Sequence, residues 1–227
     1  MSTNIPLVPR ALPNSGTGAL ATNKVIKNTY TLLTMTLALS ALTAFIALKT
    51  NAPPMPWWMG LVIMLGGPLL ISKFSASVWS IPMTFAFTAA LGYYAGPIVG
   101  MYLTMPGGSS IVFNAMATTS IIFLALSGYA LTTRKNFSFM GGFVMVGCLV
   151  VLLAIVANIF LNIPALSLAI SAAAVLLMSA AILWDTSRMV NEGETNYVMM
   201  TVSLFANIYV MFMHLLNLFS FFGGDDR

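Results

Sequence analysis

Five polar residues in the last third of the sequence are the side chains best placed to do chemistry. Asp185 and Arg188 lie at the end of a long apolar run, and Ser203, Asn207 and His214 interrupt the next one. A carboxylate in such a setting is costly to bury unless it is paired or hydrogen-bonded, so it marks a candidate functional site. The chemistry open to it is ion pairing, cation binding or proton exchange.

A polar stripe follows the last apolar segment. Ser203, Asn207, His214 and Asn217 are separated by four, seven and three residues. At about 100° per residue they fall within an arc of roughly 80° on one helix face. Such a stripe should face protein or a water-filled cavity, and two interpretations stay open: hydrogen bonds between helices, or a path for an ion or proton.

Asp185 has two candidate partners. Arg188 is one helical turn away on the same face, and an ion pair between them would fix the helix end near the cytoplasmic interface. Alternatively, Asp185 points into the protein toward the polar stripe, where burial would make it a proton-sensitive switch. His214 is interpreted as a hydrogen-bonded interior residue, because the chain has no second histidine to join it at a metal.

The composition places these residues in a polytopic membrane protein. Of the 227 residues, 59% are hydrophobic and 6% are charged, whereas a soluble domain carries about a quarter charged residues. One histidine, one cysteine and five acidic residues offer too little for a hydrolase triad or a metal cluster. We therefore expect no enzymatic activity, no metal and no cofactor, and the scattered basic residues argue against nucleic acid as a partner.

Seven apolar segments predict an all-α fold of seven transmembrane helices, each near the roughly 20 residues that a span needs. These segments are 30–48, 57–72, 82–103, 111–132, 139–161, 165–187 and 197–222. Residues 1–23 are rich in Pro, Ser, Thr, Asn and Gly and are predicted to be a flexible cytoplasmic tail. Residues 24–227 are predicted to form one transmembrane domain.

The basic residues predict the orientation. With seven spans, the tail and alternate loops carry Arg10, Lys24, Lys27, Lys73, Arg134, Lys135 and Arg188, and the other side carries Lys49 and Arg227. Cytoplasmic loops are enriched in Lys and Arg, so the N-terminus is predicted to be cytoplasmic and the C-terminus external.

Glycines in the third segment predict a close helix contact. Gly92, Gly96 and Gly100 lie four residues apart on one helix face. Because they have no side chain, another helix can approach their backbone closely.

Four stretches of the sequence together resemble the Bax inhibitor-1 family, and in particular its bacterial branch of modulators of the FtsH protease. They are "KVIKNTYTLLTMTLALSALTA", "FAFTAALGYYAGPIVGMYL", "YALTTRKNFSFMGGFVMVG" and the long run from "VANIFLNIPALSL" to "NYVMMTVSL". The resemblance covers about residues 24 to 222. It implies a seven-helix bundle in which the other six helices wrap the last one.

The resemblance implies two competing activities. Some members leak calcium through a pore gated by two aspartates that share a proton, one near the end of the sixth helix and one in the seventh. Asp185 in "LWDTS" matches the first, but Asn207 in "SLFANIY" occupies the place of the second. An amide does not ionise, so these positions do not form a two-carboxylate proton switch.

The favoured expectation is the activity of the bacterial branch. It implies a non-enzymatic regulator of the bacterial inner membrane that binds the ATP-dependent protease FtsH and restrains its degradation of membrane substrates. The tail at residues 1–23 would be the handle for the protease. The alternative is a pH-sensitive leak of the family's type, for calcium or another cation, through an interior lined by Ser203, Asn207 and His214.

Overall fold

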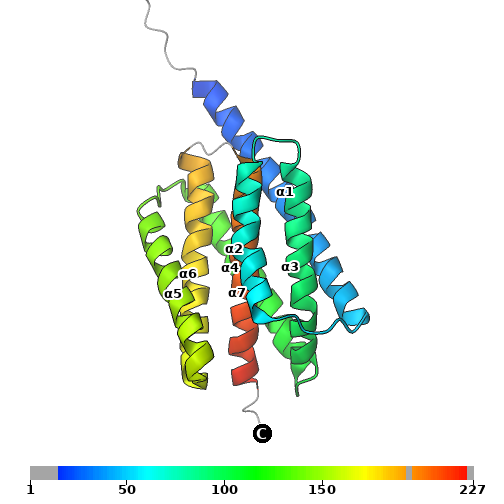
Figure 1. Cartoon of the computed structure of the whole chain (residues 1–227). Helices are drawn as coiled ribbons and strands as arrows, with labels where there is room; N and C mark the ends of the chain where they lie inside the picture. Colours follow the sequence, from blue (N-terminus) through cyan, green and yellow to red (C-terminus); the bar gives the residue numbers. More distant parts are fainter. Residues whose placement is uncertain (1–14, 193–195, 224–227) are drawn as a thin grey trace, which may run out of the picture.

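Seven α-helices make up the computed structural model, which describes residues 15–192 and 196–223 (Figure 1). They are α1 (Ser15–Lys49), α2 (Trp57–Lys73), α3 (Ser80–Leu103), α4 (Gly108–Thr133), α5 (Met140–Leu161), α6 (Pro164–Asn191) and α7 (Tyr197–Phe222). Each predicted apolar segment overlaps one helix. The all-α class is therefore confirmed.

Five of these helices are long and apolar enough to cross a membrane: α1 from Thr22, α4, α5, α6 and α7. α2 has 17 residues, fewer than the roughly 20 of a straight span. α3 has 24 residues but includes Ser, Thr, Tyr, Gly and Pro among its apolar ones. The structure is thus consistent with a polytopic membrane protein, and seven crossings remain a prediction.

α1 extends further toward the N-terminus than the sequence predicts. It begins at Ser15, so residues 15–23 are helical where a flexible tail is expected. No proline lies between Pro13 and Pro53, so no residue in that stretch lacks the backbone donor that a helix needs. Figure 1 shows the first turns of α1 projecting beyond the other helices. The remainder of the predicted tail, residues 1–14, lies outside the described residues.

The glycines of α3 bring it into close contact with α1. A Cβ atom on Gly92 would lie 2.2 Å from the backbone oxygen of Ser40, and one on Gly96 would lie 2.5 Å from Cβ of Ala47. Both distances are too short for non-bonded heavy atoms. The close helix contact predicted from the glycine spacing is therefore confirmed, and it joins two helices about 50 residues apart in the chain.

α7 packs against α1, α2, α3, α4 and α6. Its side chains Leu204, Phe205, Met211 and Leu216 are at most 1% exposed. Among the described residues α5 contacts α6 only, and it lies at the edge of the bundle (Figure 1). Within the described residues α7 therefore has five neighbouring helices, and α5 is not one of them. A last helix wrapped by the other six, as the family resemblance implies, stays a prediction.

Candidate functional site

Asp185 is a buried carboxylate near the C-terminal end of α6, with 1% of its side chain exposed. Its Oδ2 atom accepts two hydrogen bonds from α7, from Oγ of Ser203 at 2.5 Å and from Nδ2 of Asn207 at 2.8 Å. Ser203 and Asn207 are one helical turn apart, so both donors reach the same point on α6. Three of the sequence-predicted residues thus form one hydrogen-bonded group, which we call the Asp185 cluster.

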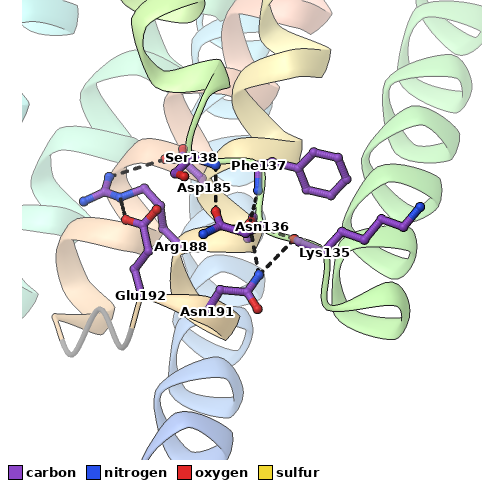
Figure 2. Close-up of polar contacts among 9 residues, drawn as sticks. Lys135, Asn136, Phe137, Ser138, Asp185, Arg188, Asn191 and Glu192 are labelled. Atoms are coloured by element: carbon purple, nitrogen blue, oxygen red, sulfur yellow. Dashed lines mark hydrogen bonds and ion pairs between the residues drawn. The ribbon is translucent and has the colours of Figure 1, made fainter.

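Arg188 connects this cluster to the end of the helix. Its Nη1 lies 3.9 Å from Oδ1 of Asp185, and its Nε lies 3.7 Å from Oε2 of Glu192 (Figure 2). The guanidinium carbon is 4.9 Å from the centre of the Trp184 ring, a cation–π distance. The two partners that the sequence offers for Asp185 are therefore both present, Arg188 on one carboxylate oxygen and Asn207 on the other.

The loop between α4 and α5 is tied to the same end of α6. Oγ of Ser187 donates to the carbonyl oxygen of Lys135 at 3.1 Å and accepts from the backbone nitrogen of Phe137 at 3.0 Å. Nδ2 of Asn191 donates to the same carbonyl oxygen at 2.9 Å (Figure 2). These bonds, the α6 clamp, satisfy backbone groups of the loop with side chains of α6. Sequence reasoning missed the clamp, although the polar run "DTSR" at the helix end is its signal.

His214 belongs to a second polar group nearer the other end of the bundle. Its Nδ1 lies 3.1 Å from Oγ of Ser171, and Nδ2 of Asn217 donates to Oγ of Ser167 at 3.0 Å and of Ser171 at 2.9 Å. His214 is seven residues from Asn207, about 10 Å along the helix. The structure therefore separates His214 from Asp185, and the polar stripe forms two groups instead of one.

Both groups of the α7 stripe meet partners on α6. Ser167, Ser171 and Asp185 lie on α6 at spacings of four and 14 residues, which places them within roughly 40° on one face. α6 thus carries a polar stripe complementary to that of α7. Sequence reasoning missed this second stripe, although the serine spacing contains it.

A cavity of about 490 Å³ adjoins the His214 group. Its polar walls come from Tyr102, Asn158, Asn162, Ser167, Ser171, His214 and Asn217. No charged side chain lines it among the described residues. The cavity can hold water or a small neutral hydrogen-bonding molecule, and it lacks the carboxylates that a calcium ion requires.

The chemistry of the Asp185 cluster is limited by its single carboxylate. Within residues 15–192 and 196–223 the other acidic residue is Glu192, which is 37% exposed and pairs with the far side of Arg188. No group of three His, Cys, Asp or Glu that could hold a metal occurs in these ranges. The cluster can therefore hold two helices together, and its described residues do not supply a pair of carboxylates that share a proton.

Comparison with known proteins identifies the family of the chain. A family model described as "Inhibitor of apoptosis-promoting Bax1" matches residues 22–224. The chain is 44% identical over 209 residues to "Modulator of FtsH protease YccA" of Escherichia coli K12, covering 92% of this chain and 95% of that protein.

Two further relatives are similar over at least nine-tenths of their length. An uncharacterized protein of Pseudomonas aeruginosa is 44% identical over 202 residues, covering 89% of this chain and 91% of the relative. An uncharacterized membrane protein of Vibrio cholerae is 37% identical over 231 residues, covering 98% and 100%. The seven helices and the match across them establish that the chain belongs to the Bax inhibitor-1 family.

Proposed function

We propose that this chain is a non-enzymatic protein of the bacterial inner membrane that binds the FtsH protease and restrains its degradation of membrane substrates. The observation that carries the proposal is the sequence identity of 44%, over 92% of the chain, to a protein named as an FtsH modulator. Similarity at this level extends through all seven helices. The Asp185 cluster supports the same proposal, because it hydrogen-bonds α6 to α7 and needs no catalytic role.

In the proposed topology all seven helices cross the membrane, with α7 at the centre of the bundle and the N-terminus in the cytoplasm. α2, α4 and α6 then end at the cytoplasmic side, where Lys73, Arg134 and Arg188 lie at or near their C-terminal ends. This agrees with the enrichment of Lys and Arg in cytoplasmic loops. The C-terminus is periplasmic in this topology.

The N-terminal end of the chain is the proposed handle for the protease. The first turns of α1 project beyond the bundle on the side of the proposed cytoplasmic face (Figure 1). A protease that pulls there must separate α1 from α3 at the Gly92 contact and then α6 from α7 at the Asp185 cluster. In this proposal FtsH engages the N-terminal segment but unfolds the helix bundle slowly, so that other membrane substrates are degraded less while it is bound.

The experiment is co-purification with FtsH from membranes, combined with turnover of a defined FtsH membrane substrate. Full-length protein is expected to co-purify and to slow the turnover. A chain lacking residues 1–14 keeps α1 intact from Ser15, and it is expected to lose the inhibition and to be degraded more slowly itself. If both quantities are unchanged, the handle is wrong; if the full-length chain neither binds FtsH nor slows turnover, the proposed function is wrong.

The family's calcium leak is the alternative, and the geometry does not favour it. The residue facing Asp185 on α7 is an amide that donates a hydrogen bond at 2.8 Å. Calcium entry into dye-loaded liposomes that changes with pH and is lost in Asp185→Asn would support the leak against our proposal.

A further inference from the structure

An apolar groove lies between α1 and α4, away from the polar stripe of α7. Its volume is about 540 Å³, within the range of roughly 300–1,000 Å³ of small-molecule sites. α3 and α7 form its floor through the buried residues Gly92, Ala95 and Phe205. Ala41, Phe45, Met116 and Ser120 form its rim and are exposed.

The groove opens sideways. In the described residues no Cα atom of α1 lies within 8 Å of one in α4, although each of these helices packs against α7. The open side therefore faces outward from the bundle between two helices that are each long and apolar enough to span the membrane. In a bilayer this opening meets lipid chains.

The walls of the groove are suited to a hydrocarbon chain. They are built mainly from Leu, Ala, Val, Phe, Ile and Met side chains. The hydroxyl groups of Thr119 and Ser120 donate to the carbonyl oxygens of Ala115 and Met116 in their own helix, at 2.7 and 2.8 Å. These two hydroxyls are thus occupied, whereas the buried hydroxyl of Tyr209, which also lines the groove, has no hydrogen-bond partner among the described residues. Apart from that hydroxyl, the walls favour apolar contact.

The ammonium group of Lys49 lies at one end of the groove. Lys49 is exposed, lies four residues after Phe45, and has its Nζ atom 5.5 Å from the centre of the Phe45 ring. Among the described basic residues, Lys49 is alone at this end of the bundle, since the others lie toward the opposite end in the proposed topology. A lysine ammonium binds phosphate as a point charge.

We propose that the groove is a phospholipid-binding site, in which one acyl chain lies along Ala41 and Phe45 and the lipid phosphate pairs with Lys49. The apolar walls, the lateral opening and the cation at one end match the two parts of a phospholipid. The site is independent of the Asp185 cluster and of any contact with FtsH.

The test is photo-crosslinking in proteoliposomes with a phospholipid that carries a diazirine in its acyl chain, followed by mapping of the labelled peptides. Wild-type protein is expected to be labelled in α1 and α4 around Ala41 and Met116, and excess unlabelled phospholipid is expected to compete. Ala41→Trp fills the groove and is expected to abolish this labelling. Ala38→Trp is the matched control, because Ala38 is exposed on the same helix but does not line the groove.

Two further variants test the proposed contact between Lys49 and the lipid phosphate. Lys49→Gln is expected to weaken labelling up to about fivefold, because an exposed ion pair contributes at most about 1 kcal/mol. Lys73→Gln, at the exposed end of α2, is expected to have no effect. If diacylglycerol, which has the same acyl chains but no phosphate, competes as well as phospholipid, the phosphate contact is wrong.

Three results would overturn the site as a whole. They are equal labelling of Ala41→Trp and Ala38→Trp, labelling confined to residues outside the groove, and labelling that unlabelled phospholipid does not reduce. A disulfide-linked dimer of Ala41→Cys, made with Cys148→Ser to remove the exposed native thiol, would instead assign the groove to a second copy of the chain.

Discussion

The side-chain nitrogen of Asn207 lies 2.8 Å from Oδ2 of Asp185, so an amide on α7 donates to the carboxylate on α6. Ser203, one turn earlier on α7, donates to the same oxygen at 2.5 Å. The other oxygen, Oδ1, receives no hydrogen bond from a described residue and faces Arg188 at 3.9 Å. The carboxylate is thus held from two sides by different kinds of contact.

A double-mutant cycle should detect the bond between Asp185 and Asn207. We expect Asp185→Ala and Asn207→Ala to show a coupling free energy of unfolding between about 0.6 and 2 kcal/mol, the range of hydrogen bonds between membrane helices. The measurement is equilibrium unfolding in mixed micelles. Asp185→Ala combined with His214→Ala is the control, because the two side chains belong to different groups and should be additive within about 0.5 kcal/mol.

Asn207→Asp should introduce a dependence of stability on pH. The substitution places two carboxylates within hydrogen-bond distance, and such a pair holds one shared proton more readily than two charges. We expect the variant to lose unfolding free energy as the pH rises, because the shared proton leaves and two negative charges face each other. Unfolding of wild-type and variant protein between about pH 5 and 8 measures this; parallel profiles would contradict it.

Gly92→Ala should separate α1 from α3. The added methyl group would meet the Ser40 backbone oxygen at 2.2 Å, and backbone cannot move aside as a flexible side chain can. We expect a loss of about 1–3 kcal/mol in unfolding free energy, as for other overpacked contacts. Gly142→Ala is the matched control, since a Cβ atom there has nothing within 4 Å and alanine favours the helix by about 1 kcal/mol.

Ser187→Ala should release the loop between α4 and α5. The change removes the acceptor of the Phe137 backbone nitrogen and one donor to the Lys135 carbonyl. We expect faster amide hydrogen exchange across residues 134–139 and a loss of about 0.5–1.5 kcal/mol in unfolding free energy, the net contribution of a typical hydrogen bond, because the loop is only partly buried and Asn191 still donates to the Lys135 carbonyl. Ser179→Ala, whose hydroxyl bonds to the carbonyl oxygen of Val175 in its own helix, should leave this exchange unchanged.

The helices were predictable from the sequence because each is defined by a local apolar pattern. α7 matches its predicted range of 197–222, and α5 differs from its range by one residue at the start. The start of α1 was not predictable in this way. Continuation of a helix beyond its apolar part depends on the bundle that anchors it, and the polar composition of residues 15–23 gave no sign of it.

The residues of the candidate site could be predicted from the sequence, but their division into two hydrogen-bonded groups could not. The spacing of Ser203, Asn207 and His214 placed them on one helix face, but their partners depend on how α6 is rotated and shifted against α7. That register is set by packing along both helices, which a single sequence does not encode as a local pattern. The α6 clamp could not be predicted for the same reason, because it joins Ser187 to Phe137, which lie 50 residues apart in the chain.

The position of α5 at the edge of the bundle has a mechanical consequence. Across residues 15–192 and 196–223, α5 contacts one other helix, whereas α1 and α7, the first and last helices, each contact several. α5 also lies between these two helices in the chain order. A force applied at either end of the chain therefore acts first on α1 or α7, which contact several helices. α5, which contacts the fewest helices in the described part of the chain, bears no force until the contacts of α1 or α7 have broken. We expect extraction from the membrane to show its largest rupture force at the first step from either end.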